Sequence, residues 1–590
     1  MATLEELARK KFSFLSEAEI RVVQAAPDGT FADCSLGGDV EPEKADTWPE
    51  TRNVRADLIR WLCVDREARE QIDPRGIQIL GARITEPLDL SFTNVLFPLG
   101  CFGCRLEQPL NLRWAKMAVL NLEGSWTKGI FADGLKLEGS LFLRNGFHAE
   151  GGVRLLGATV GGDLDAEGGT FKNPDGMALD ANSAKISGRV FLREGFSSEG
   201  EVRLLGATIG DELNAKGGTF KSAKGYALNA DRIKVTGSVF LSGGFHAEGE
   251  VRLLGATIGS SLEARGGAFK NSKRVALNAD RIEVHGSVFL GGKFVAEGTV
   301  RLVGAEIRGQ LEVDDAWLDG LDLDSADITE KFFWRNIHED HGVLHPDFPS
   351  KEWEPNLSLT AAKVGSLADE EASWPGKGRL ILDGFVYERI GGNAPIDATA
   401  RLKWLRLQPD RLGFRPQPYE QLIAVLRRMG HEDQVAKVAI AKQLDLRKRG
   451  HLGWWGWTKN WFLYLAVGYG YRAWLAFIWL LVLVVLGSCV FSRAHSANVL
   501  VPSDQEAYKP DETVKTPLPD YYPKFNAAVY SLDVIFPFDL GQKSHWRLSE
   551  KQSGALVYWI FEFYSLAQLF LGWVLLLVAA AVPAGYIKKD

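Results

Sequence analysis

The nine residues VRLLGATIG, at positions 202–210, recur unchanged at 251–259. VRLLGATVG at 153–161 and VRLVGAEIR at 300–308 are variants of the same string, and neighbouring copies start 49 residues apart. Constant spacing over four copies is typical of repeat architectures, in which each unit packs on its neighbours. The repeat therefore determines the fold of this part of the chain.

Each repeat predicts short strands. Apolar and polar residues alternate over two to four positions, as in Val202-Arg203-Leu204, and Gly, Asn or Asp ends each run. A weaker internal copy is present as well, because ALNADRIKVTGSVFLSGGF from Ala227 resembles VRLLGATIGDELNAKGGTF from Val202. We therefore predict a mainly β fold, a parallel β-helix solenoid, with two coils of about 24 residues in each 49-residue repeat.

Phenylalanine recurs at the same spacing in two columns. Like residues stack in neighbouring coils of a solenoid, so we expect both columns to fill its interior together with leucine and valine. With coils about 4.8 Å apart, residues 75–390 have room for roughly thirteen coils. The columns are Phe142, Phe191, Phe240 and Phe289, and Phe147, Phe196, Phe245 and Phe294.

The sequence outside the repeat predicts helices. Ser16 and Glu19 have the spacing of a capping box, and residues 54–69 have an amphipathic helical pattern. The repeat is lost at 330–375, where we expect a loop excursion, and resumes in a final coil from Leu380. The predicted regions are a helical N-terminal cap at 1–74, the solenoid at 75–390, a basic helical neck at 391–450 and a membrane domain at 451–590.

Two apolar segments near the C-terminus are long enough to cross a bilayer. Residues 473–491 contain no charge, and a second run covers about 556–582. The loop between them, 492–553, has seven Lys or Arg against eight Asp or Glu, whereas Lys588 and Lys589 follow the second segment. By the positive-inside rule we expect a multi-pass protein of the bacterial inner membrane, with both termini in the cytoplasm and the loop outside. The basic residues before the first segment include Arg401, Lys403, Arg406, Arg427, Arg428, Lys437, Lys442, Arg447, Lys448 and Arg449.

The composition excludes several classes of protein. A net charge of −7 over 590 residues does not suit a strongly basic nucleic-acid binder, and we expect no nucleic-acid partner. Five cysteines without regular spacing do not predict a secreted disulfide framework.

Three polar residues lie in the second apolar segment. Glu562, Ser565 and Gln568 are three residues apart, which places them on roughly one helical face. An ionisable group in hydrocarbon is costly, so Glu562 indicates a polar partner or a water-filled cavity. Alternatively, Glu562 reaches the outer interface from its place near the end of the segment.

The loop contains a short apolar segment, within 524–546, that ends at Pro537 and is followed by FDLG. Its position between two spans resembles the pore-helix and filter layout of two-span cation channels, in which Asp533 and Asp539 would ring an opening in an oligomer. The alternative is an interfacial helix that packs on the spans.

Two charged columns follow the repeat and form a candidate docking stripe for a protein partner. Ion pairs on a surface contribute about 0–1 kcal/mol each, so the alternative role of these columns is solubility and coil register. The columns are Glu150, Glu199, Glu248 and Glu297, and Arg154, Arg203, Arg252 and Arg301.

Motifs for chemistry are weak in this sequence. We find no G-x-G-x-x-G between a strand and a helix and no GxxxxGK[ST], so we expect no catalytic residues and no cofactor. Cys101 and Cys104 form a lone CxxC that predicts two buried small residues rather than a metal site. The histidines His338, His341 and His345 lie in the predicted excursion, where a solvated loop is the favoured interpretation over a metal site.

Several segments resemble a bacterial family of β-helix membrane proteins: VRADLIRWLC, DPRGIQILGARITEPLDLSF, the VRLLGATIG coils, PQPYEQLIAVLRRMGHE, GYGYRAW and VYSLDVIFPFDLGQ. The resemblance covers most of the chain and implies a membrane-bound β-helix. Members are often labelled "membrane-associated oxidoreductase", although the family supplies no catalytic residue for this sequence. The coils are also distantly similar to pentapeptide-repeat proteins.

These observations lead to three functional hypotheses. The first is a non-enzymatic recognition or scaffold module, in which a rigid cytoplasmic β-helix presents a preorganised surface. The second is an oligomeric effector that conducts ions or perturbs the membrane, with the β-helix as sensor in a stress or phage-defence response. The third is the oxidoreductase that the resemblance implies.

Overall fold

The computed structural model describes residues 2–338, 357–504, 507, 518–549 and 555–581. The chain folds into two compact units, Met1–Gly430 and His431–Asp590. Their boundary falls inside the region predicted as a neck, so that its first helices belong to the first unit and its last helix belongs to the second.

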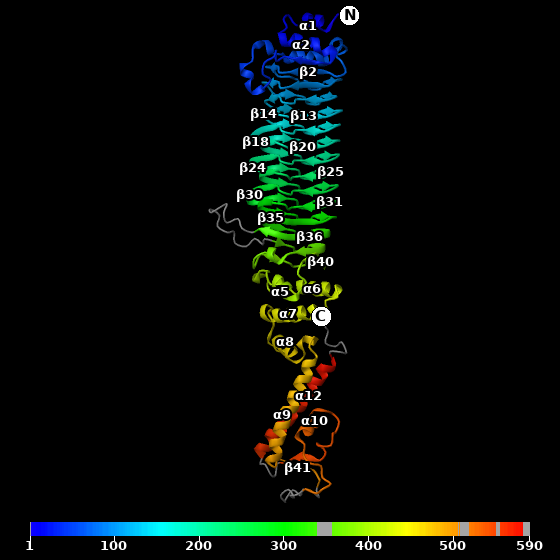
Figure 1. The fold of residues 1–590 in the computed structure, drawn as a ribbon, viewed down its shortest axis with the longest axis vertical. Coiled ribbons are helices and arrows are strands. Elements are labelled where there is room, and N and C mark those ends of the chain that lie inside the picture. Colours follow the sequence, from blue (N-terminus) through cyan, green and yellow to red (C-terminus); the bar gives the residue numbers. More distant parts are fainter. Residues whose placement is uncertain (1, 339–356, 505–506, 508–517, 550–554, 582–590) are drawn as a thin grey trace. The chain divides into compact units, whose positions relative to one another are not determined.

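The first unit contains a parallel β-solenoid, as predicted. A continuous 40-stranded sheet winds through about 13 turns, from β2 (Ile77–Leu80) to β40 (Val386–Ile390) (Figure 1). Leu164, Val190 and Leu213 occupy one register position in successive coils, so a 49-residue repeat consists of coils of 26 and 23 residues. One repeat comprises β15 (Val153–Arg154), β16 (Thr159–Val160), β17 (Leu164–Asp165), β18 (Thr170–Asp180), β19 (Lys185–Ile186), β20 (Val190–Phe191) and most of β21 (Ser197–Arg203), which continues into the next repeat.

A left-handed residue at one corner of each coil explains why glycine recurs. At this corner the backbone N–H donates to the next coil, as from Gly206 to Asp231 at 2.9 Å. Glycine adopts positive φ without strain, whereas other residues there carry a cost. The corner residues are Phe92, Trp114, Gly134, Gly157, Ser183, Gly206, Arg232, Gly255, Arg281, Gly304, Ser325, Ala361 and Gly384.

A single stack of phenylalanine rings runs through the interior of the repeat. Successive ring centroids lie 5.1–5.4 Å apart, and all seven rings are fully buried. Small residues are in register with every second ring: Ala149 pairs with Phe171, and Ala247 pairs with Phe220. These small residues leave room for the ring of the neighbouring coil. The stack consists of Phe147, Phe171, Phe196, Phe220, Phe245, Phe269 and Phe294.

The other predicted phenylalanine column lies on the outside, and our expectation of an interior position was wrong. Phe142 follows the inward Leu141, and successive side chains of a strand point to opposite faces. Cationic side chains cover these outer rings: the Arg144 guanidinium lies 4.9 Å from the Phe142 centroid, and that of Arg265 lies 3.9 Å from the Phe289 centroid.

We predict that Ser198→Ala stabilises the solenoid. Ser198 is fully buried in a register position that Ala149 and Ala247 occupy elsewhere, and its hydroxyl has no hydrogen-bond partner. Removing an unsatisfied buried hydroxyl should raise the local unfolding free energy by about 1 kcal/mol. Hydrogen exchange of the β21 amides would measure the gain, and faster exchange in the variant would contradict the prediction.

A helical cap covers the first coil. Ser16 and Glu19 form the predicted capping box, and Glu19 also pairs with Arg55 at 2.7 Å. β1 (Phe31–Asp33) extends the sheet by pairing with β2, which protects the edge strand from pairing with other chains. The helices of the cap are α1 (Leu4–Lys11), α2 (Glu17–Ala25), α3 (Ala56–Val64) and α4 (Arg66–Arg69).

A histidine in the first coils is expected to make stability depend on pH. The His148 ring stacks on Trp126, which the Arg105 guanidinium covers at 3.3 Å. Burial, with a contribution from the charge of Lys172, lowers the pKa of His148 below its ordinary value. The unfolded chain therefore binds the proton more readily, and stability should fall as the pH drops below about 6.5.

We predict that His148→Thr reduces this pH dependence, because threonine is the residue at the same register position in the next coil, Thr170. The difference in thermal midpoint between about pH 7.5 and about pH 5.5, followed by circular dichroism, should be smaller in the variant than in the native chain. An equal or larger difference would contradict the assignment to His148.

The predicted excursion at 330–375 is shorter than expected. β36 (Asp327–His338) pairs with β35 (Leu311–Asp322), and the coil resumes at β37 (Leu357–Ser358) and β38 (Lys363–Asp369). The repeat disappears from the sequence here because longer strands replace the two-residue strands and their turns. Residues 339–356, which include His341 and His345, lie outside the described residues.

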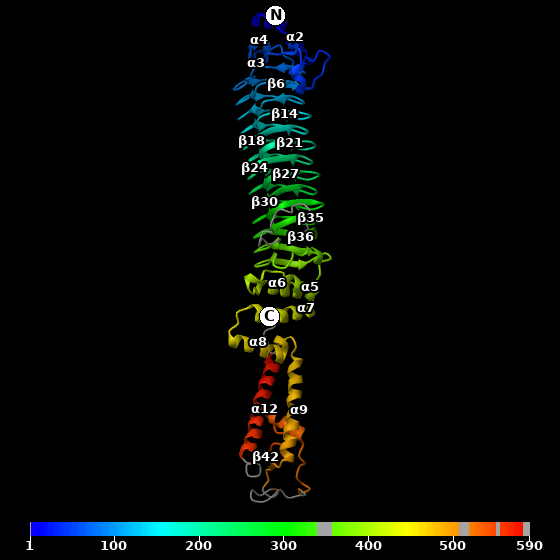
Figure 2. The ribbon, with the colours of Figure 1, turned by 90° about the vertical axis from the view of Figure 1, so that its left-hand side faces the viewer.

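The last coil ends against two helices, α5 (Ala398–Leu405) and α6 (Gln417–Arg428) (Figure 2). Side-chain amides of α6 complete the hydrogen bonds of this coil: Gln417 donates to the Phe385 carbonyl at 3.0 Å, and Gln421 donates to the Tyr387 carbonyl at 2.6 Å. An exposed stack end would offer unpaired backbone to other chains, so α6 caps the solenoid.

The second unit contains two helices long and apolar enough to cross a membrane, α9 (Trp474–Ser496) and α12 (Ala555–Ala581), which pack against each other (Figure 2). They extend over the predicted spans, and α9 continues five residues beyond its prediction. The remaining elements are α7 (Glu432–Arg449), α8 (Trp454–Val467), a short 3₁₀ helix η6 (Gly468–Gly470), β41 (Leu500–Pro502), α10 (Ala527–Ile535) and β42 (Trp546–Leu548).

Candidate functional site

A polar junction joins the three helices α9, α10 and α12. The Ser531 hydroxyl of α10 donates to the Val484 carbonyl of α9 at 3.1 Å. Gln568 of α12 donates through Nε2 to the Ser531 hydroxyl at 2.7 Å and to the Ser531 carbonyl at 3.2 Å. Ser531 and Gln568 are both buried, so α10 is anchored to the two apolar helices by side-chain hydrogen bonds.

The junction lies near the middle of both apolar helices. Gln568 is the central residue of α12, and Val484 lies close to the centre of α9. Gly487 makes the close approach possible, because a Cβ at that position would lie 2.2 Å from the Ser531 hydroxyl. α10 therefore packs on both apolar helices near their middle.

The carboxylate of Asp533 stabilises the turn that follows α10. It accepts hydrogen bonds from the backbone N–H groups of Leu540 at 2.5 Å, Gln542 at 2.8 Å and Lys543 at 3.1 Å. Asp533 is buried, and its bonds fix the chain after Pro537. This carboxylate therefore acts within the protomer, as an acceptor for its own loop.

The other candidate pore residues, Asp539, Glu562 and Ser565, do not take part in the polar junction. Asp539 is exposed, and its bond from the Gly541 N–H at 2.7 Å lowers the pKa of its carboxyl group. Glu562 and Ser565 are half-buried and, among the described residues, make no side-chain hydrogen bond. Of the predicted face of α12, only Gln568 joins the junction.

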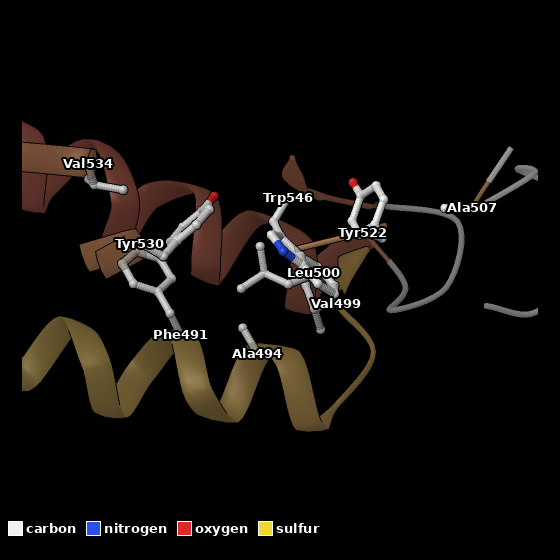
Figure 3. Close-up of a cluster of buried hydrophobic side chains, with 9 residues drawn as sticks. All are labelled: Phe491, Ala494, Val499, Leu500, Ala507, Tyr522, Tyr530, Val534 and Trp546. Atoms are coloured by element: carbon white, nitrogen blue, oxygen red, sulfur yellow. The ribbon is translucent and has the colours of Figure 1, made fainter. Parts of the chain in front are cut away.

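An aromatic cluster fixes the loop beyond the junction. Phe491 of α9 packs edge to face on Tyr530 of α10, with ring centroids 4.8 Å apart (Figure 3). Trp546 of β42 and Tyr522 complete the cluster, and β41 pairs with β42. The junction and the cluster together hold α10 at two points.

The two columns of the predicted docking stripe do not pair with each other. The arginines contact acidic residues of neighbouring positions: Arg252 lies 2.7 Å from Asp231, and Arg301 lies 2.7 Å from Asp280. Glu248 instead pairs with Lys221 at 3.1 Å. Each column therefore has its own counter-charges, while Glu150 and Glu199 remain exposed.

Two of the left-handed corner residues are exposed aromatic side chains that the sequence did not lead us to single out. Phe92 and Trp114 are 78% and 58% exposed and stand in adjacent coils. Their φ angles are +57° and +60°, a region in which bulky residues are strained. The sequence signal was present, since glycine occupies the same register position in other coils.

Two basic residues of the predicted neck are buried. Arg401 forms a two-point ion pair with Asp369, at 2.7 Å for each contact. Lys442 is buried on α7. Sequence reasoning missed both, because Asp369 fell in the predicted excursion and a count of basic residues does not distinguish buried ones from exposed ones.

The cysteines are consistent with a structural role. Cys101 and Cys104 are buried, and the contact with the Cys104 thiol together with burial raises the pKa of Cys101 well above its ordinary value. Thiolate is the reactive form, so the raised pKa makes the Cys101 thiol a poor nucleophile. In the described part of the chain, no group of His, Cys, Asp and Glu side chains could hold a metal ion.

The fold and the junction define a β-solenoid protein with two helices apolar enough to cross a membrane. No family model, curated protein or solved structure matches the chain. The family resemblance in the sequence therefore remains an expectation.

Proposed function

We propose that the protein is a membrane-anchored recognition module, whose β-solenoid presents a rigid surface to a protein partner. The observation that carries the proposal is the exposure of α9 and α12. In the most apolar 18-residue stretch of each helix, only 22% and 17% is buried inside the structure. A core helix of a soluble protein would be mostly buried, whereas a lipid bilayer would cover these apolar surfaces.

Cysteine labelling tests the anchoring. Cys489 lies exposed on α9, whereas the other four cysteines are buried. In intact membranes a water-soluble maleimide should leave Cys489 unmodified, and the same reagent should label it after delipidation. Equal labelling in both conditions would overturn the membrane anchor.

The same chemistry tests the orientation with both termini in the cytoplasm of a bacterial cell. Ser503→Cys, beyond α9, should react with the impermeant reagent from outside intact cells, while His451→Cys, before α8, should react only after the membrane is opened. The reverse pattern would overturn this orientation.

Phe92 and Trp114 support a protein partner on the solenoid. Exposed tryptophan and other aromatic residues carry a large share of binding energy in protein interfaces. Two such residues in strained corner positions, on a rigid stack, form a preorganised contact at low entropic cost. The charged stripe is a less favourable contact, because most of its arginines already pair within the solenoid.

The test replaces both aromatic residues by the glycine that other coils use. Phe92→Gly/Trp114→Gly should keep the fold, because glycine removes the strain, and should abolish co-purification of the partner with the detergent-solubilised chain. Ser183→Gly/Arg232→Gly changes the left-handed corner residues of two other coils and is the matched control. A partner retained equally by both variants would overturn this surface.

An oligomeric conducting unit is a second candidate function. The observation that favours it is the polar junction between two apolar helices, since polar groups at this depth often mark ion pathways. Currents in planar bilayers that Gln568→Leu, at the junction, and Glu562→Gln, on the same face of α12, reduce would support it. Well-folded oligomers without current would count against it.

A further inference from the structure

A cavity of about 320 Å³ lies between α7 and α8. Lys442 and Lys459 contribute the charged part of its wall, and no described residue of the wall is acidic. Leu452 and Leu463 contribute an apolar part. The cavity therefore combines positive charge with an apolar surface, which is the chemistry of an amphiphilic anion.

Hydrogen bonds hold the polar floor of the cavity in place. The Tyr469 hydroxyl donates to Asn460 Oδ1 at 2.8 Å, and Asn460 Nδ2 donates to the Gln443 carbonyl at 3.4 Å. Asn460 is buried, so its orientation is set by these contacts. A site that is ordered before its ligand arrives loses little entropy on binding.

α8, which supplies part of the cavity wall, has the composition of a membrane-interface helix. α8 exposes Trp454, Trp455 and Trp457. Tryptophan is enriched at the level of the lipid headgroups. The guanidinium of Arg447 lies 4.1 Å from the ring of Trp461 on this helix.

We propose that this cavity binds a phosphate ester, and that the source is the headgroup of an anionic phospholipid. Lys459, the exposed lysine of the wall, would hold the phosphate, and the acyl chains would follow Leu452 and Leu463. The charge of the buried Asp445, one turn from Lys442, limits the net positive potential of the site. The proposal rests on the membrane anchoring above, but its test needs no membrane.

The experiment is native mass spectrometry of the full chain in neutral detergent. Dioleoyl phosphatidic acid, phosphatidylglycerol and phosphatidylcholine are titrated separately. Dissociation constants for the two anionic lipids should be about tenfold lower than for phosphatidylcholine, which is zwitterionic. Equal affinity for all three lipids would overturn the proposal.

Two variants locate the site. Lys459→Ala removes a wall charge, and Gly456→Leu fills the cavity without changing the charge; its Cβ meets only the flexible side chain of Leu452, at 3.3 Å and beyond. Each should raise the dissociation constant for phosphatidic acid about tenfold. Lys448→Ala removes an exposed charge on α7 outside the wall and should change it less than about twofold.

Equal effects of Lys448→Ala and Lys459→Ala, or no effect of Gly456→Leu, would overturn the cavity as the site. Inorganic phosphate is the competing ligand that separates the two sources. Displacement of the lipid by inorganic phosphate at equal concentration would overturn the lipid headgroup as the natural ligand. If the cysteine test fails while these titrations succeed, the phosphate site stands without the membrane anchor.

Discussion

Replacing Gly487 by alanine is expected to lower the unfolding free energy of the second unit by about 3 kcal/mol. The added methyl group would lie 2.2 Å from the Ser531 hydroxyl and 2.6 Å from both terminal atoms of the Gln568 amide. α10 must therefore move away from α9, and Gln568 would lose its bond to Ser531 while it stays buried. Equilibrium unfolding in mixed micelles, followed by circular dichroism, measures the loss.

Val485→Leu is the matched control for this change. It adds one methylene group to the same helix at a residue that is 55% exposed. It should therefore alter stability by less than about 0.5 kcal/mol. Combining Gly487→Ala with Ser531→Ala removes the nearest clashing atom. The double variant should therefore be more stable than the sum of the single effects implies, by about 1 kcal/mol or more. Strict additivity would show that the junction does not set the helix spacing.

The solenoid could be predicted because its physics is local and repeated. Each coil needs an apolar residue at every second position and a turn residue at each corner, and both recur in the printed sequence at a fixed period. The inward or outward direction of a column could not be read from recurrence alone. Phe142 and Phe147 recur equally well, and only the strand register places the first outside and the second inside.

The junction could be predicted only in part, because its residues lie far apart in sequence. Helical periodicity identified Gln568 as a polar member of a face, but nothing local connects it to Ser531 or to Gly487. One of the two interpretations of the loop placed Asp533 at a pore, whereas its carboxylate accepts three backbone N–H groups of the following turn. Turn geometry of this kind depends on tertiary packing and leaves no periodic signal.

The buried ion pair between Arg401 and Asp369 gives the second large expected effect. Both side chains are almost completely buried, at 0% and 2% exposure, and the pair joins α5 to the end of β38. Arg401→Met should lower the free energy of local unfolding there by about 3–5 kcal/mol, because Asp369 would remain charged and buried. Hydrogen exchange of the α5 and β38 amides measures this local opening without requiring the whole solenoid to unfold.

The double variant Arg401→Met/Asp369→Asn tests the electrostatic reason for this loss. Asparagine keeps an acceptor for the Trp374 indole N–H, which donates to Asp369 at 2.7 Å, and it carries no charge. Replacing both members of a buried pair avoids an uncompensated charge, so the double variant should recover at least half of the protection lost in Arg401→Met. Lys403→Met is the control, because its partner Glu371 lies 3.2 Å away on an exposed surface and the loss should stay below about 0.5 kcal/mol. If Lys403→Met lowers the free energy of local unfolding as much as Arg401→Met does, the burial of the ion pair does not determine how strongly α5 is held to the last coils of the solenoid.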